Sequence, residues 1–341
     1  MGEQSELPSV IVLKTGGGDI SSLKDLSTFE SNLRESKEYY PSHTIVSVHS
    51  AFGGITKLLT KLYYLFRNGD EQRKSSLCEF KDYLESFYGN FSEEFKSIFV
   101  DLELSNLEVT LKSLLPIGKE KKQESQKDLD SIKWYGEFLS LRILSEYLES
   151  VSISHLHIKA KNNVVTNKVH GQALIDLDAT RKNFFPYLKS HKGSILLTEG
   201  FIGSYVNGSI RVPTTLGSEG SDYTAAALAS MFKAELVIYY KNVDGIYQIC
   251  DEKNCEGGII LATHLGVYPV LDYEGATKII EKGAKILHPQ AIKIAKEHNI
   301  PFYVKNFYNP HVRGTLIGDK AILRNIVFPK RFGITEISLS E

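Results

Sequence analysis

The chain has 341 residues, 42% of them hydrophobic and 24% charged, which is ordinary for a folded protein with a large core and excludes a mainly disordered chain. The formal net charge of −1 excludes a global basic field that would draw the protein to nucleic acid or to anionic lipid. We therefore expect no nucleic-acid partner and no membrane partner, and any anion site must be local.

The cysteines and the N-terminus predict a compartment in which thiols stay reduced. Cys78, Cys250 and Cys255 are an odd, sparse set, and they lack the second ligand pair that a zinc site needs. The N-terminus is acidic without an apolar signal segment, and no apolar run approaches the roughly 20 residues of a membrane span. We expect a cytoplasmic protein with reduced thiols and assign no metal ligands.

Two short β-branched runs near the N-terminus predict buried strands that end in glycine loops. Residues 10–13 lead into Lys14 and the glycines of 16–18, and residues 44–48 lead into the loop 50–54. Both units have the form of a strand followed at once by a loop with unusual backbone freedom.

Helices and further strands are expected in the rest of the chain. Residues 55–150 show apolar positions at helical spacing and predict a helical layer, interrupted by a charged, solvated loop at 118–124. From about residue 152 the pattern alternates between strands at 195–198, 236–239 and 301–304 and helices at 223–233, 273–283 and 291–298. Alternation of this kind predicts a mostly parallel sheet covered by helices, with ligands at the carboxyl ends of the strands.

Lys14 stands directly before a glycine-rich loop that contains Gly16, Gly17 and Gly18. Glycine N–H groups can face inward without obstruction, which suits phosphate oxygens, although the Walker A spacing is absent. Three glycines are also typical of a flexible turn. The lysine favours the phosphate interpretation, because phosphoryl transfer needs fixed positive charge on the developing equatorial oxygens.

A second glycine-rich loop enters a helix. Residues 214–223 precede the alanine-rich run 224–229, and Ser221 or Asp222 can cap the exposed N–H groups at the start of that helix. Taken alone, a helix cap is the better interpretation of Asp222.

The chain resembles the catalytic domain of the aspartate kinases, in the amino-acid kinase superfamily. The segments that carry the resemblance occur in the family's order at Lys14 with its glycines, 50–56, 136–137, 200–203, 215–223, 243–247, 283–289 and 314–316. The resemblance implies an α/β amino-acid kinase fold with a mostly parallel central sheet sandwiched by helices, in two lobes.

The resemblance also implies a division of the chain. Residues 1–190 would form an N-terminal amino-acid-binding lobe with a helical insertion, and residues 191–320 a C-terminal nucleotide-binding lobe. Residues 321–341 would be a tail similar to the start of an ACT domain, so the chain is either a catalytic domain alone or a truncated piece. A homodimer is expected.

By the same resemblance, Lys14 would neutralise the transferring γ-phosphoryl group, and Asp222 would orient Lys14 and the metal-bound phosphates. Both roles suit a transfer governed by positioning and electrostatics. The cofactors implied are ATP and Mg2+.

The implied substrate pocket contains Ser50, Thr56, Glu137 and Ser221. Glu137 would pair with the amino group of L-aspartate, and the hydroxyls would receive its carboxylates. Without the resemblance, Ser50 and Thr56 are a turn residue and a helix cap, and Glu137 is a surface helix residue.

The implied nucleotide site combines the glycines after Lys14 with Asp244, Tyr247 and Lys285. Tyr247 would lie near adenine and Lys285 near phosphate, although Tyr247 is otherwise a core aromatic. We interpret His288 as structural.

Departures from the family pattern bear on the substrate. Asp19 follows the glycines where the family has hydroxyl residues, and Ser218 lies where the family usually has an arginine that clamps the α-carboxylate of aspartate. Serine cannot replace a planar, permanently charged, bidentate donor. Arg211 is the nearest candidate substitute, against its plainer interpretation as a solvated loop arginine. The segment 248–255 replaces the family's Asp-Pro-Arg after the nucleotide strand, and Asp251 is the candidate to take the place of that aspartate.

The leading hypothesis is an aspartate kinase that converts L-aspartate and MgATP to 4-phospho-L-aspartate and ADP, the entry to lysine, threonine and methionine biosynthesis in this family. One alternative is a sister kinase with another acidic acceptor, which Ser218 favours. The other is a catalytically weakened homologue that acts as a regulatory subunit, which Asp19 favours.

Overall fold

The computed structural model describes residues 8–89, 91–92, 101–116, 124–247, 266–282 and 287–323. Within them an eight-stranded sheet has the order β3-β4-β2-β1-β7-β9-β10-β8. Its strands are β1 Val10–Thr15, β2 Thr44–His49, β3 Leu156–Ile158, β4 Ile195–Glu199, β7 Leu236–Lys241, β8 Val270–Leu271, β9 Phe302–Asn306 and β10 Thr315–Ile317. All neighbouring strands are parallel except β9 and β10. The predicted α/β fold with a mostly parallel sheet is confirmed.

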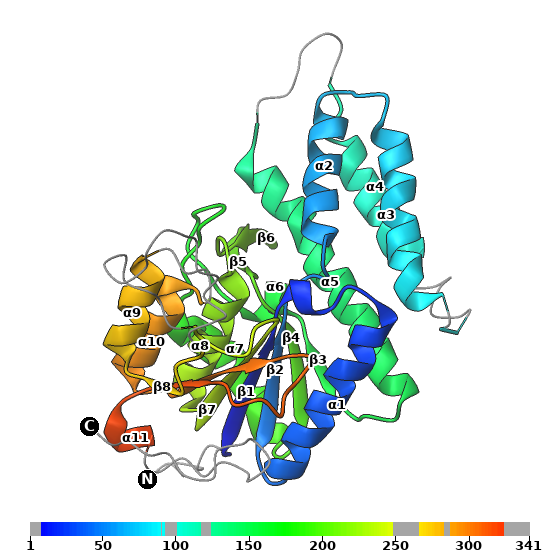
Figure 1. Ribbon diagram of the computed structural model, residues 1–341. Helices are drawn as coiled ribbons and strands as arrows, with labels where there is room; N and C mark the ends of the chain where they lie inside the picture. Colours follow the sequence, from blue (N-terminus) through cyan, green and yellow to red (C-terminus); the bar gives the residue numbers. More distant parts are fainter. Residues whose placement is uncertain are drawn as a thin grey trace, which may run out of the picture.

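The two faces of the sheet belong to two separate cores. Ile11 and Leu13 of β1 pack with α1 (Leu23–Tyr39) and α5 (Gln126–Ser150), whereas Val10 and Val12 face the opposite side. That second core includes α7 (Leu177–Ser190), α8 (Gly220–Phe232), α9 (Tyr273–Glu281) and α10 (Pro289–His298). Because helices cover both faces (Figure 1), every residue of β1 and β2 is buried.

The helical layer expected at 55–150 has a different form in the structure. Helices α2 (Ile55–Arg67), α3 (Arg73–Tyr88) and α4 (Asp101–Lys112) pack with the first turns of α5 into a bundle that projects beyond the sheet (Figure 1). Buried leucines and aromatics of all four helices join one core cluster. These helices bury their apolar stripes mainly against each other, which periodicity alone cannot distinguish from packing on a sheet.

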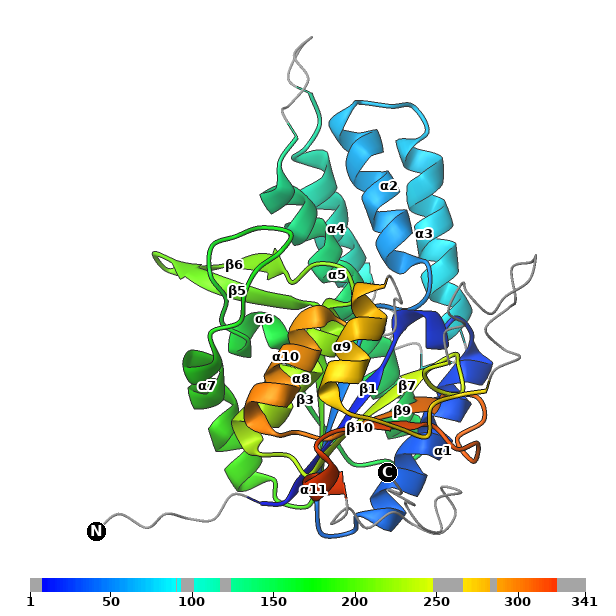
Figure 2. The same cartoon turned by 60° about the vertical axis from the view of Figure 1, so that its left-hand side comes forward.

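An antiparallel hairpin of β5 (Ile202–Asn207) and β6 (Ile210–Thr215) lies apart from the main sheet, so Arg211 belongs to a strand and not to a loop. The turn of the hairpin contains Gly208 with φ of +63°. The hairpin packs on α5 and on the short helix α6 (Ala160–Asn163), as Figure 2 shows.

Helix α8 begins at Gly220 rather than at residue 223. Glu219 occupies the N-cap in the left-handed region, with φ of 57°, and makes no side-chain cap. The helix-cap interpretation of Asp222 is therefore wrong, because Asp222 lies inside the first turn. His288 does cap a helix: its Nδ1 accepts from the Gln290 N–H at the start of α10, which confirms its structural role.

Short elements complete the described chain, namely the 3-10 turn η1 at Gly17–Asp19 and the helix α11 at Lys320–Leu323. Within the described residues no helix combines the length and the apolar character needed to cross a membrane. Cys78 is an exposed free thiol. Cys250, Cys255, residues 118–123 of the expected charged loop and the tail from 324 lie outside the described residues.

Candidate active site

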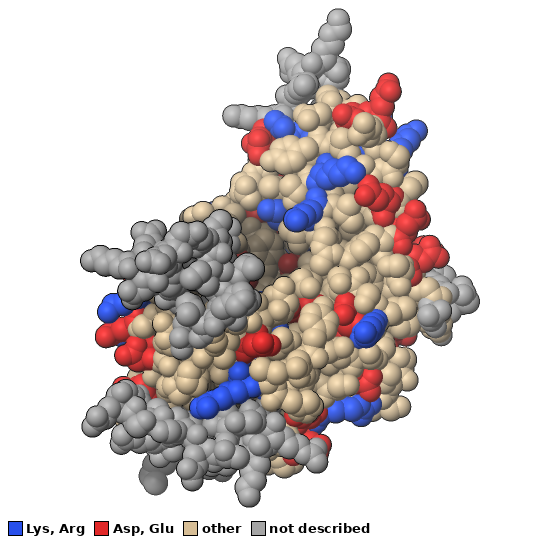
Figure 3. Space-filling model, in the orientation of Figure 1, with Lys and Arg blue, Asp and Glu red and all other residues tan. Residues whose placement is uncertain are grey.

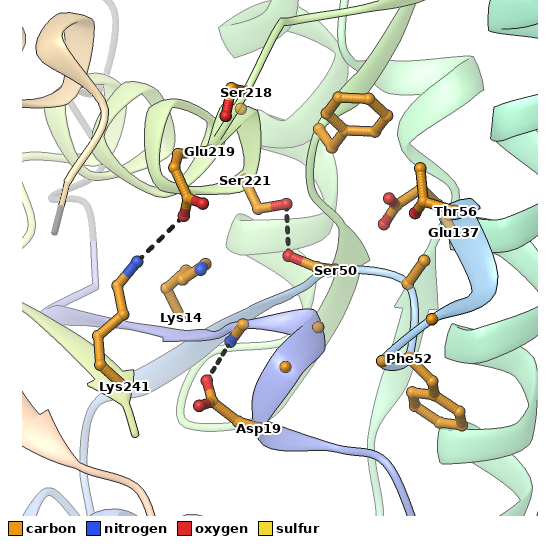
Figure 4. Close-up of a pocket in the computed structure, with 18 of the residues that line it drawn as sticks. Lys14, Asp19, Ser50, Phe52, Thr56, Glu137, Ser218, Glu219, Ser221 and Lys241 are labelled. Carbon is orange, nitrogen blue, oxygen red and sulfur yellow. Dashed lines mark hydrogen bonds and ion pairs between the residues drawn. The ribbon is translucent and has the colours of Figure 1, made fainter. Parts of the chain in front are cut away.

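A cavity of about 660 Å³ opens where β1, β2 and β7 end, and Figure 3 shows a hollow between the helical bundle and the body of the molecule. Its lining residues are Lys14, Gly16, Gly17, Gly18, Asp19, Ser50, Ala51, Phe52, Gly53, Gly54, Thr56, Lys57, Glu137, Phe201, Ser218, Glu219, Gly220, Ser221, Lys241 and Asn242. Parallel strands present their carboxyl ends at one edge, so loops distant in the sequence meet here. Figure 4 shows the lysines at one end of the cavity and Thr56 with Glu137 at the other.

The centre of the lysine end is an ion pair between β1 and the first turn of α8. Lys14 Nζ lies 2.8 Å from Asp222 Oδ1, and their side chains are 2% and 0% exposed. Burial alone would raise the pKa of Asp222, but Lys14 and Lys241 outweigh it and hold that pKa below its ordinary value. Asp222 therefore stays ionised and can fix the position of the Lys14 ammonium.

Lys241, the last residue of β7, binds the same carboxylate. Its Nζ lies 3.0 Å and 3.1 Å from the two Asp222 oxygens. The strand register explains the convergence: Lys14 is paired with Tyr239, so Lys241 lies two residues farther along β7 on the same face of the sheet. Tyr239 adds a hydrogen bond from its hydroxyl to the Asp222 carbonyl oxygen.

The glycine loop after β1 packs tightly against the loop after β2. A Cβ on Gly17 would collide with the Ala51 carbonyl oxygen, so this position requires glycine. The Gly16 N–H donates to Asp19 Oδ2 at 2.8 Å. Burial raises the pKa of Asp19 to about 6, although Lys14 opposes the shift. An acidic group thus occupies the loop that the sequence predicts for phosphate, and it engages one of the loop's N–H donors.

The opposite end of the cavity contains the hydroxyls and one buried acid. Ser50 Oγ donates to Ser221 Oγ at 2.7 Å, which joins the end of β2 to the start of α8. Thr56 on α2 and Glu137 on α5 lie beside each other here (Figure 4). The four predicted substrate-binding residues therefore share one cavity with Lys14.

Glu137 is buried, at 3% exposed, yet its Oε2 has no hydrogen-bond partner among the described residues. Burial raises its pKa well above the ordinary value; a hydrogen bond with the Ala51 backbone and the Lys14 charge oppose the shift, and Glu199 adds to it. A buried acid with an unpartnered oxygen is costly unless a cation is brought to it. The amino group of a substrate would satisfy this oxygen.

A sequence model of the amino acid kinase family matches residues 9–306, which is most of the chain. The chain belongs to this family. Among curated relatives, aspartokinase 1 of Arabidopsis thaliana is 29% identical over 245 residues, which cover 69% of this chain and 40% of the relative. The aspartokinase of Geobacillus stearothermophilus is 27% identical over 212 residues, covering 60% of this chain and 48% of the relative. The chain thus spans less than half the length of each.

Solved structures show the same fold. Escherichia coli aspartokinase III in complex with aspartate and ADP superposes with a TM-score of 0.77 at 23% identity, covering 92% of this chain and 65% of that chain. The aspartate kinase of Clostridium acetobutylicum has a TM-score of 0.70 at 19% identity, covering 91% of this chain and 63% of that one. These likenesses confirm the amino-acid kinase fold.

Of the other predicted nucleotide residues, Asp244 and Tyr247 are described, and neither is among the described residues that line the cavity. Asp244 accepts a hydrogen bond from Asn306 Nδ2 at 2.7 Å, and Tyr247 forms an isolated bridge with Val267. Lys285 and Asp251 lie outside the described residues. The predicted adenine and phosphate roles of Asp244, Tyr247 and Lys285 therefore stay predictions.

Two further lysines, which the sequence did not predict as site residues, line the cavity. Lys241 ends a buried strand at the same edge as Lys14, and that shared position was the available signal. Lys57 lies at the other end, next to Thr56, and forms no ion pair with the described residues.

Ser218 lines the cavity as expected. Arg211 lies in the hairpin, donates to Ser204 Oγ at 3.4 Å and is not a lining residue.

Proposed function

We propose that this chain is an ATP-dependent kinase that phosphorylates a carboxylate of a small amino acid, with L-aspartate as the leading acceptor. Family membership and the printed names of the aspartokinase relatives support a kinase of this kind. The observation that carries the proposal is one continuous cavity with a buried lysine–aspartate pair at one end and an unpartnered buried acid among hydroxyls at the other.

The lysine end suits the phosphates of the nucleotide. Lys14 is held by Asp222 at the edge of the glycine loop, so its charge is already positioned when the γ-phosphoryl group arrives. Among the described residues no group of three His, Cys, Asp or Glu side chains could hold a metal ion by itself. Mg2+ would enter with the nucleotide as MgATP, held by phosphate oxygens, with Glu219 as a nearby carboxylate.

The hydroxyl end suits an α-amino acid. Glu137 would receive the ammonium group, and Lys57, Thr56 and Ser50 would receive carboxylate oxygens. A side-chain carboxylate oxygen of the acceptor then attacks the γ-phosphorus, a new P–O bond forms, and the bond from the γ-phosphorus to ADP breaks. A carboxylate is already ionised near neutral pH, so this transfer needs no general base. The chain's contribution is therefore position and charge.

We also propose the corresponding division into lobes, with residues 1–190 carrying the acceptor end and residues 191–320 carrying nucleotide contacts. Thr56 and Glu137 lie in the first range, and Asp222 and Lys241 lie in the second.

The deciding experiment measures ADP release from MgATP with L-aspartate, L-glutamate, succinate and N-acetyl-L-aspartate, and traps acyl phosphate with hydroxylamine. We expect turnover and hydroxamate with L-aspartate and a large loss with succinate and N-acetyl-L-aspartate, which lack the cationic amino group that Glu137 would pair with. Turnover with L-glutamate alone would replace aspartate by the sister-kinase alternative. No turnover with any acceptor, together with intact nucleotide binding, would leave the weakened regulatory homologue as the function.

A further inference from the structure

We propose that Lys241 is a second phosphate-binding residue, which contacts the β- or γ-phosphate of the nucleotide beside Lys14. This inference rests on the proposed function, because it assumes that a nucleotide occupies the lysine end of the cavity.

The first observation is the common geometry of the two lysines. Both ammonium groups lie within hydrogen-bond distance of the Asp222 carboxylate, Lys14 at 2.8 Å and Lys241 at 3.0 Å. They come from neighbouring parallel strands and project from the same face of the sheet at its carboxyl edge. Two cations that share one carboxylate are held close together, as adjacent phosphoryl groups of one nucleotide are.

The second observation is the balance of charge. Asp222 carries one negative charge and faces two lysines, so these three groups by themselves carry one net positive charge, and Glu219 and Asp19 are the other acids that act on Lys241. The further partner of Lys241 is Glu219 at 3.3 Å, and that side chain is 43% exposed. Exposed ion pairs are weak, so an incoming phosphate can take the place of Glu219. Lys14 alone is sufficient to neutralise Asp222.

The third observation is the access of Lys241 to the cavity. Its side chain is 11% exposed, against 2% for Lys14, and it lines the cavity next to Asn242. Figure 4 shows Lys241 reaching in from the end of β7 toward Glu219, across from the glycine loop that bears Asp19. A lysine placed only to neutralise Asp222 has no need of this access.

The test compares the affinities of β,γ-imido-ATP and AMP, each with Mg2+, by calorimetry on the full chain. One charge-assisted hydrogen bond corresponds to about tenfold to a hundredfold in affinity. We therefore expect Lys241→Met to bind β,γ-imido-ATP about tenfold or more weakly, with AMP affinity unchanged, because AMP lacks both the β- and the γ-phosphate. Lys241→Arg should recover most of the lost affinity, since it restores the cation. In turnover, the KM for ATP should rise in Lys241→Met while the acceptor KM stays constant.

The matched control is Lys296→Met, which removes another lysine 3.2 Å from a carboxylate, that of Glu274, away from the lining of the cavity. It should leave both affinities unchanged. If Lys241→Met does not fold, Lys241→Gln keeps a donor for Asp222 and takes its place. Unchanged β,γ-imido-ATP affinity, or equal losses for both ligands, would overturn the role of Lys241. A wild-type chain that binds neither ligand would instead overturn the proposed function.

Discussion

The ammonium group of Lys14 and the carboxylate of Asp222 form a buried pair, 2.8 Å apart, that joins the first strand of the sheet to the first turn of α8. Lys241 completes the arrangement from β7. An ionised pair withdrawn from water is a weak source of stability, because desolvation offsets the attraction. Under the proposed function, the pair at the end of the open cavity would keep a cation positioned for a phosphoryl group.

Lys14→Met and Asp222→Asn should each lower kcat by about a hundredfold or more, because each removes charge that is organised for the transition state. Their effects on stability should differ. Asp222→Asn leaves two lysine charges facing each other without a carboxylate, and breaking a buried pair in this way costs about 3–5 kcal/mol in the free energy of unfolding.

Lys14→Met should cost less stability than Asp222→Asn, since Lys241 still neutralises Asp222. Steady-state kinetics and urea unfolding of the two variants measure both effects. A kcat within twofold of wild type in either variant would remove that residue from the mechanism.

Glu137→Gln should raise the KM for the acceptor and also stabilise the fold at neutral pH. Burial raises the pKa of Glu137 well above its ordinary value, so between these two values the folded chain keeps a proton that the unfolded chain has lost. The folded state binds more protons in that range, and its stability therefore falls as the pH rises. Glutamine has no such penalty.

Urea unfolding of wild type and Glu137→Gln at pH 4 and at pH 7 tests whether the stability of the wild type falls as the pH rises. The stability advantage of the variant should be small at pH 4 and larger at pH 7. An advantage that shrinks toward pH 7 would show that Glu137 is stabilised in its ionised form without substrate.

Asp19→Asn should strengthen nucleotide binding above pH 6. The Asp19 pKa of about 6 means that the carboxyl is mostly neutral at pH 5 and ionised at pH 8, where its charge lies next to the incoming phosphates. We expect the KM for MgATP in wild type to rise about tenfold relative to Asp19→Asn between these pH values, equivalent to ~1.4 kcal/mol. The titration of ATP itself affects both enzymes equally, so it cancels in the ratio of their KM values. A KM ratio that stays constant across this range would exclude Asp19 as a phosphate-repelling group. A ratio of wild type to variant that falls as the pH rises would indicate that Asp19 is a ligand of Mg2+.

Lys57→Met should raise the KM for L-aspartate about tenfold without changing the KM for ATP, because Lys57 lines the acceptor end and has no described counter-charge.

Ser218→Arg should lower the aspartate KM with little change in kcat, the signature of added uniform binding. Arg211→Ala serves as the control and should leave both KM values unchanged, since Arg211 contacts Ser204 in the hairpin instead of the cavity. A strong effect of Arg211→Ala with none from Lys57→Met would reverse the assignment of the acceptor cation.

Those parts of the protein that depend on local pattern could be predicted from the amino-acid sequence. The runs that form β1, β2, β4, β7 and β9 are mostly apolar, because helices cover both faces of the sheet and bury successive residues of each strand. This local pattern can be recognised in the sequence. Lys14 and its glycines were predictable for a similar reason, since a strand, a lysine and a flexible loop are contiguous. The family resemblance then placed Ser50, Thr56, Glu137 and Ser221 in one pocket, and they do line one cavity.

The partners of the charged residues, in contrast, follow from the packing of elements that are distant in the sequence. Asp222 looks like a helix cap until β1 and β7 bring Lys14 and Lys241 to its carboxylate. From the sequence, Glu137 resembles a surface helix residue, but in the structure it is buried and lines the cavity. Arg211 is close to Ser218 along the chain, yet the hairpin directs it to Ser204. Charge and burial act through distances in space, and those distances depend on how strands far apart in the sequence are placed side by side.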